Sequence, residues 1–164
     1  MRFILTIISF AIPILAFTSP YDDGVRRFND GHYYDAARAL LKVHDGKSEY
    51  MLYKIYKKTG NDKEAIGHLK LSGEQRYIKA MRLLDSMNIK NSKGKPYYEV
   101  MADMGIVDME VKAASLTKDR LKKFEWLLDA ARKGDVPSMA KLGDIYLTTL
   151  RPKEAKILAS YRLH

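Results

Sequence analysis

Residues 126–146 read Trp126-Leu-Leu-Asp-Ala-Ala-Arg-Lys-Gly134-Asp-Val-Pro-Ser-Met-Ala-Lys-Leu-Gly-Asp-Ile-Tyr146, with apolar residues at helical spacing on both sides of a turn at Lys133-Gly-Asp135. Two helices joined by so short a turn pack as an antiparallel hairpin. After Pro20 the chain shows helical periodicity and no sustained strand-like alternation, so we expect an all-α protein. Further turn sequences divide it into segments of helix length: Asn29-Asp-Gly31, His44-Asp-Gly46, Thr59-Gly-Asn61, Lys93-Gly-Lys-Pro96 and Leu150-Arg-Pro152.

Small residues recur twelve positions apart, with a turn between the two members of each pair. Two helices can cross closely only where the side chains at the contact are small. Tyr53 occupies one of these positions and predicts a wider crossing there. The pairs are Gly24 with Ala36, Tyr53 with Ala65, Ala102 with Ala114, and Gly143 with Ala155.

This spacing resembles that of the tetratricopeptide repeat, and residues 126–146 resemble the related Sel-one-like repeat. The residues that carry the second resemblance are Trp126, Ala130, Ala131, Gly134, Asp135, Leu142, Gly143 and Tyr146. Residues 21–72 match more weakly as two tetratricopeptide-like hairpins, and residues 73–117 match poorly. The resemblance implies that residues 19–164 form one α-solenoid domain that binds proteins or peptides on its concave face.

The N-terminus has the pattern of a secretory signal. Met1-Arg2 precedes an apolar stretch over residues 3–17, which is shorter than the ~18–20 residues that cross a bilayer as a helix. We expect residues 1–18 to be a signal peptide cleaved near Ala16, Thr18 or Ser19, and the mature protein to be periplasmic or secreted. The alternatives are an uncleaved anchor in the inner membrane and a buried core helix.

The composition of the chain excludes several classes of protein and of binding site. The chain of 164 residues has no cysteine, which excludes disulfide scaffolds, thiolate zinc sites, thiol enzymes and lipoproteins anchored through cysteine. Lys and Arg total 29 against 20 Asp and Glu, a net charge of +9. Loss of Arg2 with the signal peptide would leave 28 against 20. This charge permits contact with an anionic membrane surface, but an exported chain without a nucleic-acid module is not expected to bind DNA or RNA.

No catalytic, metal-binding or cofactor-binding residue is predicted. His32 and His44 could form a metal pair, but turn and helix-end roles explain them better. Ser115-Leu-Thr-Lys118, Ser92-Lys-Gly-Lys95 and Lys58-Thr-Gly60 match fragments of the penicillin-recognising serine enzymes. Their order along the chain is wrong for that family, so we interpret them as chance matches.

The predicted binding site is a strip on the helix expected after Gly46. Leu52 and Tyr56 would face the core, and the opposite face carries Lys47, Tyr50, Lys54, Lys57 and Lys58. In tetratricopeptide-like stacks this face lines the concave groove, so the resemblance places the strip there. Lysines can recognise an acidic helix, loop or chain end. The alternative is a solvated helix face without a partner.

The leading hypothesis is therefore an exported repeat scaffold without catalytic activity, which binds a protein or peptide, in our reading an acidic one. One alternative is a periplasmic immunity or inhibitor protein that masks a toxin or enzyme. Another is a small hydrolase acting on the cell wall or on β-lactams. The sequence does not specify the partner or the oligomeric state.

Overall fold

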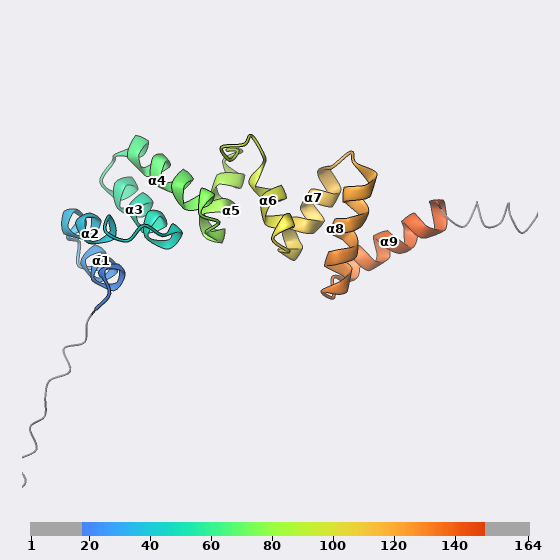
Figure 1. Cartoon of the computed structure of the whole chain (residues 1–164), viewed down its shortest axis with the longest axis horizontal. Coiled ribbons are helices and arrows are strands. Elements are labelled where there is room, and N and C mark those ends of the chain that lie inside the picture. Colours follow the sequence, from blue (N-terminus) through green and yellow to red (C-terminus); the bar gives the residue numbers. More distant parts are fainter. Residues whose placement is uncertain (1–17, 150–164) are drawn as a thin grey trace, which may run out of the picture.

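The computed structural model describes residues 18–149, which form helices packed one after another in an α-solenoid. Figure 1 shows them in a row along the long axis, from α1 and α2 at one end to α9 at the other. The predicted all-α fold is confirmed. Residues 18–149 contain no β-strand. They form nine helices: α1 (Pro20–Asn29), α2 (Tyr33–Leu40), α3 (Gly46–Lys58), α4 (Asp62–Glu74), α5 (Ile78–Ser86), α6 (Tyr97–Asp103), α7 (Val107–Leu116), α8 (Arg120–Arg132) and α9 (Val136–Thr149).

Three of the sequence predictions fall wholly or largely outside the described residues, the third being the crossing of Gly143 with Ala155. The predicted signal segment is described only at Thr18, and the predicted turn at residues 150–152 is not described.

Side-chain caps fix where several helices begin. Ser19 Oγ accepts a hydrogen bond from the Asp22 amide at 3.1 Å, and Asp45 Oδ1 accepts one from the Ser48 amide at 2.7 Å. Asp135 Oδ2 caps α9 in the same way, through the Ser138 amide at 2.9 Å. Each cap satisfies an amide that has no partner within its helix, and together they set the start of α1, α3 and α9.

Glycine in the left-handed region ends α1, α3 and α8. Gly31, Gly60 and Gly134 have φ angles of 82°, 81° and 94°. The next residue then donates its amide to a carbonyl five positions back, as His32 does to Arg27 at 2.8 Å. This closure needs a positive φ, which glycine adopts without a steric penalty. The turns predicted at residues 29–31, 59–61 and 133–135 are therefore confirmed.

The predicted small-residue crossings differ between the two ends of the stack. A Cβ on Gly24 would lie 2.5 Å from Leu40 Cγ, so α1 and α2 approach closely there. Ala65 is fully buried, and Ala102 and Ala114 are nearly so. Gly143 is exposed, and no described residue lies within 4 Å of a Cβ built on it. Its predicted partner, Ala155, lies outside the described residues.

Residues 73–117, where the repeat resemblance was poorest, contain a close approach that the twelve-residue spacing did not predict. A Cβ on Gly73 of α4 would lie 2.5 Å from Leu84 Cδ1 of α5. The following connection, residues 87–96, is held against α4 by Glu74. This carboxylate accepts hydrogen bonds from Ser92, from the amide at 2.7 Å and from Oγ at 3.0 Å.

The core consists of three clusters that follow one another along the chain. The first spans α2 and α3, the second α4 to α6, and the third α6 to α8. Met109 packs against both the second and the third cluster, whereas the first shares no residue with the second among those described. The buried members of the first are Ala36, Ala37, Leu40, Met51, Leu52 and Ile55; of the second, Leu69, Ala80, Met81, Leu84, Tyr97 and Met101; of the third, Ala102, Ala113, Ala114, Trp126 and Leu127.

Candidate protein-binding surface

Two lysines of the predicted strip lie over aromatic rings of a neighbouring hairpin. Lys47 Nζ is 3.9 Å from the centroid of the Tyr21 ring, and Lys54 Nζ is 5.8 Å from that of Phe28. The lysines belong to α3 and the rings to α1, which are the first helices of the first two hairpins. A ring face attracts an ammonium group at these distances, by about 0.5–1 kcal/mol at an exposed site. The contacts hold the two charges in defined positions on the surface.

The other two lysines have different surroundings. Lys57 Nζ lies 2.9 Å from Asp62 Oδ1 at the start of α4, and this hydrogen bond raises the pKa of Lys57. Lys58 is exposed and pairs with no carboxylate among residues 18–149; the same holds for Lys47 and Lys54. Three charges of the strip are therefore available to an acidic partner, and the fourth is already paired.

Tyr50, the aromatic member of the strip, is part of the packing between helices. It is half-buried, with its ring centroid 5.7 Å from that of Tyr53 and 5.4 Å from that of Tyr77. Burial raises the pKa of its phenol. Tyr50 packs against the second core cluster, whereas Tyr56 packs against the first and Leu52 belongs to it. The aromatic groups beside the lysines are therefore Tyr21 and Phe28.

Tyr21 and Phe28 were missed because the contacts join residues 26 positions apart in sequence. A usable signal was present: Tyr21 and Phe28 are seven apart, and so are Lys47 and Lys54. Residues seven apart lie on one face of a helix. Because the two rings and the two lysines have the same spacing on the first helices of adjacent hairpins, the sequence could have predicted that each lysine lies over one ring.

The serines of the enzyme-like fragments make hydrogen bonds within the helical stack. Ser115 Oγ donates to the Lys112 carbonyl at 2.7 Å, and Ser92 Oγ donates to Glu74 at 3.0 Å. The Ser115 hydroxyl bonds within its own helix, and the Ser92 hydroxyl ties the connection before α6 to α4.

His68 of α4 contacts two residues of α3. Its Nδ1 lies 2.6 Å from Glu49 Oε2, and its ring stacks on Tyr56 with a centroid separation of 5.0 Å. Across residues 18–149, no group of three or more His, Asp or Glu side chains is arranged to hold a metal ion.

None of the helices within residues 18–149 has the length and apolar character needed to traverse a bilayer. Comparison with protein-family models, curated proteins and solved structures finds no match to this chain.

Proposed function

We propose that this protein is an exported, non-catalytic repeat scaffold that binds an acidic segment of another protein through the surface shared by α1 and α3. We call this the basic surface and define it as Tyr21, Phe28, Lys47, Lys54 and Lys58. One observation carries the proposal: two lysine ammonium groups are held over the rings of a neighbouring hairpin while facing no carboxylate among the described residues.

This arrangement suits recognition of carboxylates. The cations are exposed, so a partner reaches them without unfolding the stack, and their positive field would steer an acidic chain toward them. Side chains already held in place lose less conformational entropy on binding than free lysines do. The resemblance to tetratricopeptide-like repeats supports the same surface, because the first helices of the hairpins line the concave face in those proteins.

The test is binding of a fluorescein-labelled hexaglutamate peptide, measured by anisotropy. The charge-reversal variant Lys47→Glu/Lys54→Glu should bind about tenfold or more weakly than the wild type, because two attractions become repulsions. Raising the salt concentration should weaken wild-type binding, since exposed charges are screened.

The matched control is Lys63→Glu/Lys70→Glu. These lysines are exposed, seven apart on α4, and the change in net charge is identical. Binding by this control should stay within about twofold of the wild type. Equal losses in both variants would mean that the peptide responds to overall charge, and no loss in either would remove the basic surface as a binding site.

Export rests on the signal pattern of residues 1–18. It is checked by the intact mass of the protein recovered from a periplasmic fraction, which should correspond to cleavage near residues 16–19. A full-length mass would favour the anchored alternative.

A further inference from the structure

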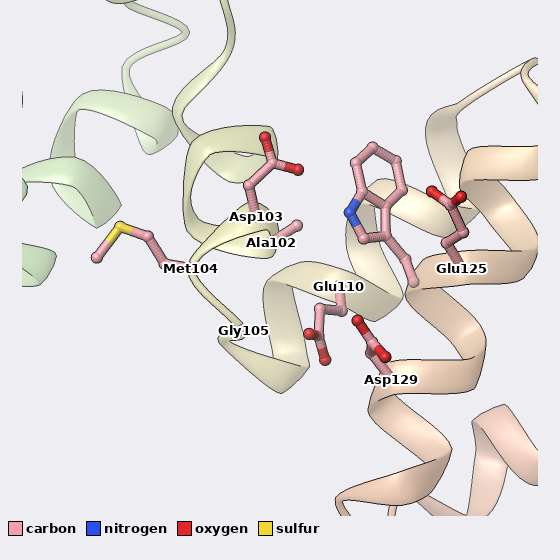
Figure 2. Close-up of a pocket in the computed structure, with 8 residues that line it drawn as sticks. Ala102, Asp103, Met104, Gly105, Glu110, Glu125 and Asp129 are labelled. Atoms are coloured by element: carbon pink, nitrogen blue, oxygen red, sulfur yellow. The ribbon is translucent and has the colours of Figure 1, made fainter.

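A cavity farther along the stack is acidic, in contrast to the basic surface. It lies between α6, α7 and α8 and has a volume of about 450 Å³. All its charged lining residues are acidic, although the chain carries a net charge of +9. Figure 2 shows Asp129 projecting from α8 toward α7, which carries Glu110. The lining residues are Ala102, Asp103, Met104, Gly105, Glu110, Glu125, Trp126 and Asp129.

One oxygen of the buried Glu110 carboxylate has no hydrogen-bond donor among the described residues. Glu110 is 1% exposed, and its Oε1 accepts a hydrogen bond from Lys133 Nζ at 2.5 Å. Its Oε2 is buried and has no donor within residues 18–149. A buried carboxylate oxygen without a donor is costly, and a cation bound in the cavity would stabilise its negative charge.

The neighbouring carboxylates are only partly neutralised. Lys95 pairs with Asp103, and Arg132 lies 3.6 Å from Asp129, but neither cation lines the cavity. Glu125 has no ion-pair partner within the part of the chain that the structure describes. The cavity therefore retains negative potential on its solvent side, where Glu125 and Asp129 are exposed.

Trp126 adds an aromatic wall. It is 7% exposed and lines the same cavity as the four carboxylates. Carboxylates beside an indole attract an organic cation through charge and through the ring face together. Among the organic cations of proteins, a guanidinium group fits this set well, because it is planar, stacks on aromatic rings and donates to two carboxylates at once. The carboxylates of residues 18–149 form no cluster suited to a metal ion.

We infer that this cavity, which we call the acidic cavity, binds the arginine side chain of a partner protein. Glu125 and Asp129 receive the guanidinium at the entrance, Trp126 packs against it, and the buried carboxylate of Glu110 attracts it through charge. The inference does not depend on the basic surface, since the two sites share no residue and attract opposite charges.

The chain contains one tryptophan, so selective excitation of indole reports on the acidic cavity alone. The probes are the blocked peptide acetyl-Gly-Arg-Gly-amide and its citrulline counterpart, which has nearly the same shape without the charge. The arginine peptide should produce a saturable change in Trp126 fluorescence, and the citrulline peptide should produce none. An equal response to the two peptides, or no response to either, would overturn the inference. A lysine peptide that binds as tightly as the arginine peptide would overturn the assignment to a guanidinium.

The variant test uses Glu125→Gln/Asp129→Asn, which keeps the shape of both side chains. The dissociation constant for the arginine peptide should rise about tenfold, because two exposed attractions are lost. The matched control Glu64→Gln/Asp144→Asn removes two exposed carboxylates on α4 and α9, outside the acidic cavity. It should bind within about twofold of the wild type. An unchanged dissociation constant in the cavity variant would reject the site, and far-UV circular dichroism of both variants verifies that the helices are intact.

Discussion

The basic surface and the acidic cavity use the same two kinds of group, charges and aromatic rings, in opposite ways. On α1 and α3 the protein supplies exposed cations and places them over its own rings. Between α6 and α8 it supplies carboxylates around a ring, and one of them is buried. The difference predicts different costs of mutation. Exposed charges contribute to recognition with little effect on stability, whereas a buried charge affects stability whenever its partner is removed.

The largest effect on stability is expected where the buried charge loses its cation. Lys133→Met removes the partner of Glu110, whose side chain is 1% exposed, and should lower the free energy of unfolding by about 2–3 kcal/mol. The matched change at the basic surface, Lys54→Met, should cost about 0.5 kcal/mol. Urea unfolding followed by circular dichroism measures both. Equal losses of unfolding free energy in the two variants would show that the buried and the exposed charges do not differ in their effect on stability.

Gly24 and Gly143 were both predicted to lie at close helix crossings, at opposite ends of the stack, and the same substitution should affect them in opposite directions. Gly24→Ala should cost about 1–3 kcal/mol, because the new Cβ would lie 2.5 Å from Leu40 Cγ. Gly143→Ala should instead stabilise the protein by up to about 1 kcal/mol, since alanine favours the helix and no described residue obstructs it. Thermal unfolding of the two variants gives the sign of each change. Destabilisation at residue 143 would show that a close crossing exists there.

A smaller effect on stability is expected at high pH from the second core cluster, which lies between the basic surface and the acidic cavity. Tyr97, in the second core cluster, is 1% exposed, and burial raises its pKa from 10.0 to about 12. Between these values the unfolded chain releases the phenolic proton while the folded chain keeps it. The free energy of unfolding should therefore fall as pH rises from 10 to 12, by about 1–2 kcal/mol from this residue. Tyr97→Phe should show a correspondingly smaller fall in urea titrations across that range, and parallel pH profiles would contradict the assignment.

The parts of the fold that could be predicted from sequence are those set by local rules. Glycine turns at residues 31, 60 and 134 follow from backbone sterics, and Leu52 faces the core as its helical position predicts. The approach of α4 to α5 at Gly73 was not predicted, because Gly73 meets Leu84, which is eleven positions later and is not small. A search for small residues twelve positions apart does not find a contact in which only one residue is small.

The candidate sites were less predictable. Four lysines of the strip were identified by their shared helix face, but the pairing of Lys57 with Asp62 depends on how α4 leaves the turn. Tyr50 was assigned to the surface, and the structure packs it against Tyr77. The acidic cavity was missed because Glu110 in a helix is expected to face solvent, and its ion pair with Lys133 joins residues 23 positions apart in sequence.

The position of Met109 between the second and third clusters has a consequence for cooperativity. Stacked repeats unfold together only to the extent that neighbouring units share contacts. With Met109 packed against both clusters, the region from α4 to α8 is expected to open as one unit, with similar amide-exchange protection throughout. The first cluster shares no residue with the second among those described, and it is joined to α4 through α3, where Tyr50 and Tyr53 pack against the second cluster and Tyr56 stacks on His68. Occupation of the basic surface would then protect the amides of α1 to α3 most and those around Trp126 least.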